Sequence, residues 1–384
     1  MKVLHILSDW KWTGPAEPVT LLCRALRDRG IEVDLLCRPP LPGASGGIEE
    51  MAADLKPDTF LRLRKSPNLL SNLRDIARLA RHIDTQAIDV VHTHTTHDQM
   101  IGGWAAKYSR RRPPVVRTNH TARPLPEGFW SQRLMALADG LVEISSRALR
   151  HDTRAFGFPA DRTVRVEGCI PLERFRPDAR VPDVRGEFGL APEHVVAGVV
   201  SRVQRHRRFD VLLEAWRQAM AQEERLRGMI VGRGTHIREV AVEPARRLGI
   251  APKVVFTGYR RGADYVAALA AMDFLVFLVP GSDGSCRAAR EAMAMGKAVI
   301  AARRGLLPEL VEDGVCGLLI RDTPEELAEA VVTLARGAGL RRRLGQAAAD
   351  KAARTFGSET VAEQLHEFYR HLPRRTKPYL GRRG

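Results

Sequence analysis

The stretch DFLVFLVPGSDGSCRAAREAMAMGKAVIA, residues 273–301, indicates how this chain folds. It begins with a short apolar run, 274–279, of the kind that forms a buried strand in a parallel sheet. A helix of good helix formers is predicted at 286–295, and Gly296 supplies its C-terminal stop. A second strand follows at 299–301. Strand, helix and strand in this order form one βαβ unit, which predicts a doubly wound α/β fold.

The loop between this strand and helix, residues 282–285, predicts an anion-binding site. Gly284 can adopt backbone angles that other residues avoid, and the free N–H groups at the start of a helix attract negative charge. Asp283 lies in the loop and Glu291 lies about two turns into the helix, so the two carboxylates can face different parts of one ligand. Two ordinary roles compete with this one. Asp283 can cap the helix, and Glu291 can be an exposed acid.

The same alternation of strand and helix runs through the whole chain. Strands are predicted at 3–7, 31–36, 60–63, 90–94, 115–118 and 141–144, and again at 195–200, 229–231, 254–257, 274–279 and 299–301. Two such series predict two doubly wound, Rossmann-like domains, at 1–175 and 188–356. Prolines and charges at 171–185 mark the linker between them. A last helix at 358–371, within the segment 357–384, is expected to pack back on the first domain.

Size and charge limit the partners of the protein. The chain has 384 residues, enough for two domains with full cores, and it carries a net charge of +16 with a pI near 10.3. Such a charge favours polyanionic partners, namely nucleic acid, an anionic membrane or phosphorylated ligands. Aromatic residues are not interleaved with the basic ones and no nucleic-acid-binding module is recognisable, so we expect no nucleic-acid partner.

Cysteine use and hydropathy indicate the cellular compartment. The five cysteines contain no CxxC pair, which predicts neither a disulfide framework nor a zinc site; they are Cys23, Cys37, Cys169, Cys286 and Cys316. The apolar stretch in residues 1–7 is cut off by Asp9 and is too short for a signal peptide. No apolar run approaches the length of a transmembrane helix. We therefore expect a cytoplasmic protein.

The segment Asp283-Gly-Ser-Cys-Arg-Ala-Ala-Arg-Glu291 resembles the signature of the retaining GT-B glycosyltransferases of family 4, also called glycosyl transferases group 1. That signature has two glutamates separated by seven residues beside a glycine. Here the first acid is an aspartate, and Ser285–Cys286 stands where the family has an aromatic residue and a glycine. The segments SRVQRHRRFDVLLEAW, MIVGRGTHIREV and VVFTGYR resemble the family in the same order.

The resemblance covers nearly the whole chain and implies an architecture. Two Rossmann-like domains would face a central cleft, with the acceptor on the side of the N-terminal domain and the nucleotide sugar bound by the C-terminal domain. The segments IDVVHTH, VVRTNH and EGCIPLERFRP resemble first-domain and linker segments of the family. Single motifs of this length carry little weight, but their shared order and spacing are specific.

The resemblance also implies roles for individual residues. Those expected near the chemistry are Asp283, Arg202, Arg207 and His120, and those expected at the donor are Glu291, Gly284, Ser285, Cys286, Gly14, Gly232 and Tyr259. Arg202 and Arg207 stand at the family's arginine and lysine and would hold a diphosphate as its charge develops. The alternative is that 205–208 is a solvated basic loop. Gly14 is followed by Pro15 where the family has a second glycine, which removes one N–H donor.

Histidines of the first domain suggest two further roles. His92, His94 and His97 in HTHTTH suggest a metal site, because His92 and His94 lie on one face of a strand. No matching cluster is evident elsewhere in the sequence and the family needs no bound metal, so we expect neither a metal nor a tightly bound cofactor. His120 resembles the histidine that contacts the transferred sugar in relatives. The alternative is a structural histidine at the end of a strand.

The reaction implied by the resemblance is the transfer of a sugar from a UDP- or GDP-sugar to a glycan or a lipid-linked acceptor, with retention of the anomeric configuration. The setting it implies is the synthesis of a cell-envelope polysaccharide or glycolipid. Two alternatives stay open. One is another GT-B enzyme, such as a nucleotide-sugar epimerase or a phosphorylase. The other is a non-catalytic protein with a degenerate donor pocket, which the departures at Asp283, Ser285–Cys286 and Gly14–Pro15 favour.

A basic amphipathic helix at 68–83 bears on where the acceptor is met. Its arginines recur at helical spacing beside an apolar face, and other cations are nearby: Arg74, Arg78 and Arg81; Leu70, Leu73, Ile76 and Ala77; Arg62, Arg64, Lys65, Lys107 and Arg110–Arg112; and, in the tail, Arg374, Arg375, Lys377, Arg382 and Arg383. With Phe129 and Trp130 in a later loop, this surface suits peripheral binding to anionic lipid at the inner face of the membrane. The alternative is that the apolar face packs on the sheet and the arginines are merely solvated.

The two acids give a direct test. If Asp283 contacts the sugar and Glu291 the ribose, Asp283→Asn and Glu291→Gln should each lower turnover at least about tenfold, which corresponds to about 1.4 kcal/mol in activation free energy. The unfolding temperature should stay close to that of the parent protein. Steady-state kinetics of nucleotide release from the donor measures the effect, and parental rates in both variants would contradict the assignment.

Overall fold

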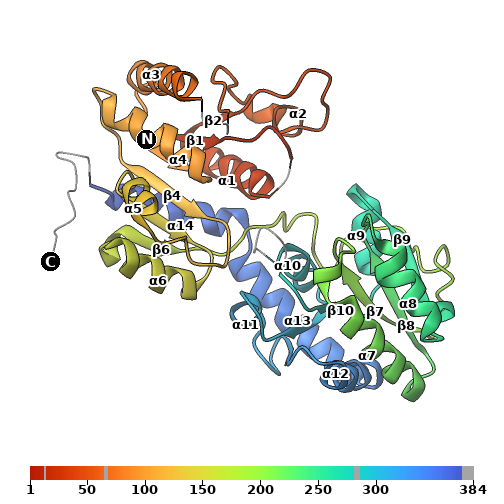
Figure 1. The fold of residues 1–384 in the computed structure, drawn as a ribbon. Coiled ribbons are helices and arrows are strands. Elements are labelled where there is room, and N and C mark those ends of the chain that lie inside the picture. The colour runs from red at the N-terminus through yellow and green to blue at the C-terminus, as the bar shows by residue number, and fades with distance from the viewer. Residues whose placement is uncertain (13, 65–67, 281–285, 374–384) are drawn as a thin grey trace. The chain divides into compact units, whose positions relative to one another are not determined.

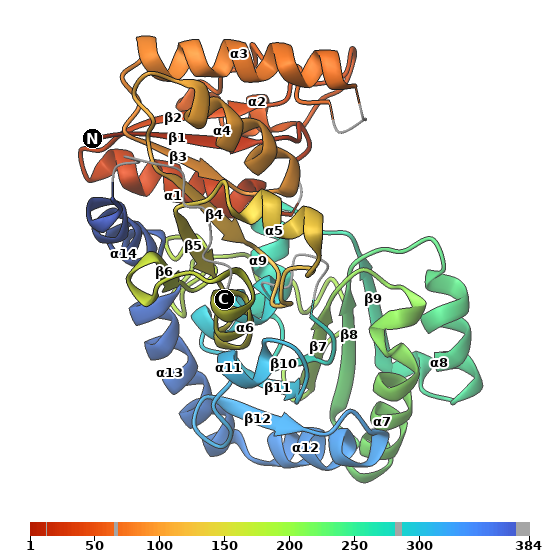
Figure 2. The same ribbon diagram turned by 60° about the vertical axis from the view of Figure 1, so that its left-hand side comes forward.

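A computed structural model describes residues 1–12, 14–64, 68–280 and 286–373 of the protein. The chain divides into two compact units, Met1–Cys169 with Ser358–Gly384, and Ile170–Gly357. Each unit contains a six-stranded, fully parallel sheet with helices on both faces (Figure 1, Figure 2). The predicted doubly wound α/β fold is therefore confirmed. The segment 171–185, interpreted from the sequence as a linker, belongs to the second unit.

The sheet of the first unit has the strand order β2-β1-β3-β4-β5-β6. Its strands are β1 (Lys2–Leu7), β2 (Glu32–Cys37), β3 (Val90–Thr93), β4 (Val115–Asn119), β5 (Gly140–Glu143) and β6 (Thr163–Arg165). Its helices are α1 (Ala16–Asp28), α2 (Ile48–Met51), α3 (Leu69–Thr85), α4 (Thr96–Tyr108), α5 (Phe129–Met135), α6 (Ser146–Phe156) and α14 (Ser358–His371), with the 3-10 turns η1 (Ala53–Leu55) and η2 (Ala160–Arg162). The order reverses between β1 and β3, which is where such sheets bind ligands.

Strand β1 explains how this unit builds two cores. Its side chains alternate between the two faces of the sheet, as in any strand. Val3 and Leu7 pack in a core with residues of α1 and α14. Leu4 and Ile6 pack in a second core with residues of α3 and α4. Because both faces are covered, the strand is apolar almost throughout, as the sequence pattern predicts.

Helix α14 completes the first of these cores from the far end of the chain. It packs along α1, as Figure 2 also shows. A Cβ on Gly140 would lie 2.9 Å from the Phe368 ring, so this ring rests directly on the backbone at the start of β5. The Tyr369 hydroxyl is 2.6 Å from His92 Nδ1, inside the same unit. The C-terminal helix is thus an integral part of the first unit.

The sheet of the second unit has the order β12-β11-β10-β7-β8-β9. Its strands are β7 (Val195–Val200), β8 (Leu226–Val231), β9 (Val254–Gly258), β10 (Phe274–Phe277), β11 (Ala298–Ala302) and β12 (Gly317–Ile320). Its helices are α7 (Phe209–Gln222), α8 (Glu243–Arg247), α9 (Gly262–Ala270), α10 (Arg287–Ala294), α11 (Leu307–Leu310), α12 (Pro324–Arg336) and α13 (Ala338–Thr355), with η3 (Arg205–Arg207), η4 (Arg238–Val242) and η5 (Ala251–Lys253). Here the order reverses between β7 and β10.

Glycines inside the strands of the second unit make room for large side chains above the sheet. A Cβ on Gly228 would lie 2.4 Å from the ring of the fully buried Trp216 of α7. A Cβ on Gly198 would lie 2.0 Å from the Met272 sulfur. These two positions let a helix and a loop approach the sheet more closely than any side chain would allow.

The structure differs from the predicted elements at residues 60–63, at β6 and β12, and at Phe129 and Trp130, which begin α5 instead of lying in a loop. Residues 60–63 are not a strand, because Leu61 and Leu63 are buried but the backbone N–H groups of Arg62 and Leu63 donate to the Asp75 carboxylate rather than to a neighbouring strand. The strands β6 and β12 were not predicted. Both are short edge strands, and β6 is only partly buried, so neither carries the continuous apolar run used to recognise the others.

The alternative interpretation of helix α3, that its apolar face packs on the sheet, is wrong. The residues of α3 that face the core are Ser71, Asp75, Leu79, Ala80 and Ile83. Leu70, Leu73 and Ala77 are exposed, and Ile76 is partly buried. The helix turns this way because the buried Asp75 carboxylate accepts the two N–H groups of the preceding loop, which places its own side on the sheet.

A substitution in α14 tests its part in the first unit. Phe368→Ala should lower the free energy of unfolding of that unit by about 3–5 kcal/mol, because the ring is buried against the sheet and leaves a cavity. Phe129→Ala is a matched control, since Phe129 is 63% exposed and its removal should change stability by less than about 0.5 kcal/mol. Urea denaturation followed by circular dichroism measures both, and equal effects would contradict the role assigned to α14.

Candidate functional site

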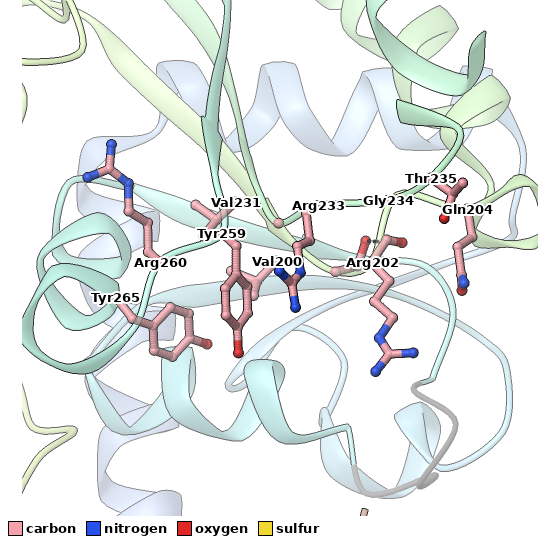
Figure 3. A pocket seen from close by; sticks show the side chains of 12 residues that line it. Val200, Arg202, Gln204, Val231, Arg233, Gly234, Thr235, Tyr259, Arg260 and Tyr265 are labelled. Atoms are coloured by element: carbon pink, nitrogen blue, oxygen red, sulfur yellow. Dashed lines mark hydrogen bonds between the residues drawn. The ribbon is translucent and has the colours of Figure 1, made fainter. Parts of the chain in front are cut away.

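A cavity of about 600 Å³ opens at the carboxyl ends of β7, β8 and β9 (Figure 3). It is lined by Val200, Ser201, Arg202, Gln204, Val231, Gly232, Arg233, Gly234, Thr235, Tyr259, Arg260 and Tyr265. Doubly wound sheets bind their ligands outside the carboxyl ends of the strands, next to the point where the strand order reverses. In this unit that point lies between β7 and β10, so the cavity has the expected position.

Two glycines let the loops after β7 and β8 stack closely on each other. A Cβ on Gly232 would lie 1.9 Å from the Ser201 carbonyl oxygen, and a Cβ on Gly234 would lie 1.8 Å from the Val203 carbonyl oxygen. Gly232 has a φ of +151°, and its N–H donates to the Gly258 carbonyl at 2.9 Å. Any side chain at either glycine would push the loops apart. Backbone therefore forms the floor of the cavity.

The side chains around this floor are positively charged. Arg202, predicted from the sequence, is exposed and lines the cavity together with Arg233 (Figure 3). Within the described part of the chain neither guanidinium is in an ion pair, and none of the described lining residues is acidic. Two guanidinium groups over a backbone floor are suited to a diphosphate, because arginine binds such groups through paired hydrogen bonds.

Tyr259, also predicted from the sequence, supplies a flat aromatic face at one end of the cavity. Its ring is 53% exposed. The guanidinium carbons of Arg233 and Arg261 lie 4.6 Å and 4.9 Å from the ring centre, where a cation is attracted to the ring face. The two arginines pack against the ring, and about half of the residue remains exposed beside the cavity.

Arg207 lies apart from the described lining of this cavity. Its Nη1 donates to the carbonyl oxygens of Val279 at 3.2 Å and Pro280 at 2.9 Å, just after β10. It therefore anchors the segment that leads to residues 281–285. Arg208, next in the chain, binds Asp322 at 3.2 Å and has a φ of +60°. The basic run at 205–208 is thus divided between different structural tasks.

Glu291 lies behind the cavity rather than on its surface. It is 1% exposed and accepts hydrogen bonds from the Tyr265 hydroxyl at 2.5 Å and from Arg287 Nε at 2.7 Å. Burial and the neighbouring carboxylate raise the pKa of Tyr265 well above its usual value, so its hydroxyl keeps its proton. Tyr265 lines the cavity (Figure 3), so Glu291 acts there by holding the Tyr265 hydroxyl in position.

The signature loop is only partly within the described residues. Asp283, Gly284 and Ser285 lie outside the described residues, and their assigned roles stay predictions. Cys286 is described; it is buried, and it begins α10 with a φ of +52°. Gly296 ends the helix with a φ of +70°, as predicted for a C-terminal stop. The predicted strand, helix and strand of this stretch are therefore confirmed around the undescribed loop.

Gly14 lies in the other unit, at the start of α1. It is exposed, its φ is +57°, and a Cβ there would meet no atom within 4 Å. Pro15 forms the N-cap and has no side-chain hydrogen bond to offer. The glycine is therefore required by its backbone angle and not by a close neighbour among the described residues.

A chain of histidines occupies the carboxyl edge of the first sheet. His5 Nδ1 lies 3.0 Å from His94 Nε2, and His94 Nδ1 lies 3.0 Å from His120 Nε2. Both nitrogens of the neighbouring His92 are 2.6 Å from hydroxyl groups, those of Tyr369 and Thr118. The sequence brought His92 and His94 together correctly but did not indicate His5, which lies on β1 with no motif around it.

The direction of the hydrogen bonds among these histidines follows from one ring nitrogen that has no hydrogen-bond partner. His5 Nε2 is buried and has no partner among the described residues. A proton there would be a buried, unsatisfied donor, so His5 carries its proton on Nδ1 and donates it to His94. Neutral His94 then donates from Nδ1 to His120, whose own proton is left on Nδ1. The network thus selects the tautomer of His120 at the edge of the sheet.

All four rings of this group are held neutral by burial. Burial lowers the pKa of His5 to about 3, and burial followed by the Arg117 charge lowers the pKa of His120 to about 3. The pKa values of His92 and His94 are also well below their usual range, first because of burial. The rings therefore act as hydrogen-bond groups over the physiological pH range, and not as cations.

The metal site that HTHTTH suggests takes a different form in the structure. Ligand atoms of His5, His92 and His94 lie within 4.8 Å of one another, whereas His97, on α4, is 2.9 Å from the Ser8 hydroxyl just after β1. Each nitrogen of His92 and His94 already has a hydrogen-bond partner. A cation would have to displace those partners in a buried site with no carboxylate in the group. The donor set fits a hydrogen-bonded network better than a metal.

Several lining residues were not singled out from the sequence. Arg233, Thr235 and Arg260 lie in MIVGRGTHIREV and VVFTGYR, so the motifs contained them and only Gly232 and Tyr259 were named. Tyr265 had no sequence signal, because its importance comes from a hydrogen bond to a residue 26 positions away.

Comparisons with known proteins agree with this geometry. The family described as glycosyl transferases group 1 matches residues 194–336, and glycosyltransferase family 4 matches residues 14–174. D-inositol 3-phosphate glycosyltransferase of Xylanimonas cellulosilytica is 30% identical over 387 residues, covering 92% of this chain and 90% of the relative. Each match spans most of a domain or more, and together they reach both units.

Solved structures have the same fold. A glycosyltransferase from Rickettsia africae superposes with a TM-score of 0.82 at 18% identity, covering 97% of this chain and 98% of that one. HepE from Anabaena in complex with UDP and glucose superposes with a TM-score of 0.74 at 21% identity, covering 96% and 98%. The two-domain α/β architecture is therefore the GT-B fold.

The neutral histidines predict how stability depends on pH. Their folded pKa values lie below the usual 6.5, so the unfolded chain binds more protons below that pH and stability falls as the solution is acidified. Between about pH 7.5 and about pH 5.5 the loss should reach about 1.4 kcal/mol for each fully buried ring. In His5→Asn the loss of stability between these two pH values should be smaller by the contribution of one ring, about 1.4 kcal/mol.

Urea denaturation at the two pH values measures this dependence. The control is His371→Asn, because His371 is exposed at the end of α14 and its removal should leave the pH dependence of the parent protein unchanged. An identical loss on acidification in His5→Asn and in the parent protein would contradict the neutral state assigned to His5.

Proposed function

Because this chain belongs to the glycosyltransferases of group 1 and family 4, we propose that it transfers a hexose from a nucleotide-diphosphate sugar to a glycan or lipid-linked acceptor, with retention of the anomeric configuration. The observation that carries this proposal is the cavity at the ends of β7, β8 and β9. It combines two arginines outside any ion pair among the described residues, a backbone floor made by two glycines, and an exposed tyrosine ring.

The parts of the cavity correspond to the parts of such a donor. Arg202 and Arg233 would bind the diphosphate, and Tyr259 would stack on the base. HepE, which has the same fold, is known in complex with UDP and glucose, and this supports a uridine donor here. Tyr265 and Glu291 would lie at the ribose, with the Tyr265 hydroxyl positioned by the carboxylate. GDP is the other donor nucleotide to be tested.

The chemistry would depend on stabilising the leaving diphosphate. As the bond from the sugar to the diphosphate breaks, negative charge grows on the phosphate oxygens, and a fixed guanidinium lowers the energy of that state. Arg202, which lines the cavity, would take this role, and Arg207 would hold the segment after β10 next to the sugar. Asp283 would bind a sugar hydroxyl. The departing phosphate oxygen would accept the proton of the acceptor hydroxyl on the same face, which accounts for retention.

The proposal includes no metal and no bound cofactor. The positive charge that a divalent cation would bring to the diphosphate would come from Arg202 and Arg233 instead. His120, with its tautomer set by His94, would donate a hydrogen bond from Nδ1 to the transferred sugar or the acceptor. Activity that survives EDTA would support the metal-free form of the reaction.

The acceptor is the least constrained part of the reaction. The relative from Xylanimonas cellulosilytica is named for D-inositol 3-phosphate, a soluble polyol phosphate. We propose a phosphate-bearing glycan or lipid of the cell envelope, met by a cytoplasmic enzyme at the inner face of the membrane. The exposed arginines of α3 support this, since each basic residue near an anionic surface adds attraction. No helix in the described ranges is long and apolar enough to cross a membrane. Sedimentation with anionic and neutral vesicles measures the association.

Two other functions remain distinct from this proposal. A nucleotide-sugar epimerase of the same fold would release free sugar or nucleotide without needing an acceptor. A non-catalytic donor-binding protein would bind the nucleotide sugar and turn nothing over, and the departures at Asp283 and Gly14–Pro15 are the features that favour it. Analysis of the product by NMR in the presence and absence of acceptor separates all three, because only transfer yields a new glycosidic bond of retained configuration.

The arginines of the cavity provide the decisive binding test. Arg202→Ala and Arg233→Ala should each weaken UDP binding by about 1.5–3 kcal/mol, the usual contribution of hydrogen bonds to charged groups. Arg205→Ala is the matched control, because the Arg205 side chain is 71% exposed and is paired with Glu239 outside the cavity. Calorimetry with UDP and with GDP measures both the losses and the preferred base. Equal losses in all three variants would indicate a diffuse basic surface instead of a site.

A further inference from the structure

The first unit exposes large apolar side chains on two helices, α3 and α5. On α3, Leu69 is 71% exposed and Leu70 is 69% exposed, and Leu73 is exposed as well. On α5, Trp130 is 82% exposed and Phe129 is 63% exposed. Contiguous apolar surface of this kind often marks a binding site, whereas single exposed apolar residues scattered over a surface do not. Helix α4 lies next to both helices and joins the two exposed groups.

Between these helices the surface is hollowed into a groove of about 890 Å³. It is lined by Leu69, Asn72, Thr95, Thr96, His97, Met100, Trp104, Trp130, Arg133, Leu134 and Leu137. Sites for small molecules usually measure about 300–1,000 Å³ and are mainly apolar with a few polar groups, which describes this groove. All of its lining residues belong to the first unit, whereas the donor cavity belongs to the second.

The charges of the groove are of one sign. Arg133 lines it and lies 5.1 Å from the Phe129 ring centre, while Lys107 lies 4.6 Å from the ring centre of Trp104 on its wall. None of the described lining residues is acidic. An apolar groove with cations at its walls complements a molecule that joins a hydrocarbon chain to an anionic group, because the chain leaves water and the anion gains a partner.

The polar end of the groove lies where an acceptor is expected. Thr95, Thr96 and His97 follow β3 directly, at the carboxyl edge of the sheet and next to the point where its strand order reverses. His94, which orders His120, precedes them in the chain. The groove therefore runs from the edge that carries the histidine network, along α4, to the exposed aromatic residues of α5 and the leucines of α3.

We propose that this groove binds the hydrocarbon chain of a lipid phosphate, with the phosphate near Arg133 and the sugar-accepting end at the carboxyl edge of the sheet. This rests on the function proposed above and names its acceptor class. The apolar side chains stay exposed in the free protein because their partner is the acceptor chain. A flat bilayer contact would use the outer leucines of α3 but would leave the concave part of the groove empty.

Monododecyl phosphate, below its micelle concentration, is the probe for this site. Binding to the full chain is followed by calorimetry, with inorganic phosphate and dodecanol as separate arms. We expect monododecyl phosphate to bind at least about tenfold more tightly than either of the two, because only it fills both the groove and the cationic wall. Tight binding of inorganic phosphate alone would mean a simple anion site and would overturn the proposal.

Variants locate the binding. Trp130→Ser and Leu69→Ser should each weaken the binding of monododecyl phosphate at least about fivefold, and Arg133→Gln should remove its advantage over dodecanol. The control is Leu41→Ser, since Leu41 is 50% exposed on the same unit but lies away from the groove lining. Leu69, Trp130 and Arg133 are all exposed, so these variants should fold like the parent protein. Unchanged binding in Trp130→Ser and Leu69→Ser would overturn the proposal.

The outcome is separable from that of the donor site. UDP binding is measured on the same samples and should not change in the groove variants, because the donor cavity lies in the other unit. Loss of groove binding with intact UDP binding in the parent protein would refute only the lipid acceptor. A protein that binds monododecyl phosphate but no nucleotide would refute the proposed reaction instead. Loss of sedimentation with anionic vesicles in Trp130→Ser, with unchanged binding of monododecyl phosphate, would assign the surface to the bilayer and would overturn the groove proposal.

Discussion

Both sheets of this protein are parallel and are covered by helices on both faces, and this constraint decides where chemistry can occur. A strand buried on two sides is mostly apolar, because an unpaired polar group is costly there, and many polar side chains gather past its carboxyl end. In the second unit that edge holds Arg202, Arg233 and Tyr259. In the first unit it holds His94 and His120. The two edges differ in charge, because one is made of exposed guanidinium groups and the other of buried, neutral imidazoles.

The two edges reach their state by different physical means. In the cavity of the second unit, Gly232 and Gly234 let two loops approach closely, so Arg202 and Arg233 lie exposed beside a floor of backbone. In the histidine network, burial makes the charged form costly, and a chain of hydrogen bonds from His5 through His94 fixes one tautomer. An exposed cation suits the binding of a phosphate, whereas a neutral ring of fixed tautomer suits the recognition of a hydroxyl. The division fits a reaction that joins a charged donor to a neutral hydroxyl group.

The surface of the first unit departs most from ordinary globular design. Asp75 accepts two backbone N–H groups from the loop before α3, and this hydrogen bonding turns the helix so that Leu69, Leu70 and Leu73 face outward. The exposed leucines, Trp130 and the groove along α4 then form one continuous apolar region bordered by arginine and lysine. Such a surface is the one for which we propose an amphiphilic partner.

The sequence alone determined the order of strands and helices, the buried strands of both sheets and the glycines that end helices, because these depend on the local pattern of apolar residues and on single backbone angles. It also indicated Arg202, Gly232 and Tyr259, which stand in compact motifs directly after strands. Only the tertiary structure decided which residues meet across the chain. His5 joins His94, Tyr265 joins Glu291, and Arg233 stacks on Tyr259 through contacts that no local pattern records. The edge strands β6 and β12 were likewise beyond the sequence, because short strands at an edge carry little apolar signal. The sequence left open whether the apolar face of α3 packs on the sheet, and the tertiary structure decided it, because Asp75 is buried together with Leu79, Ala80 and Ile83 on the other side of the helix.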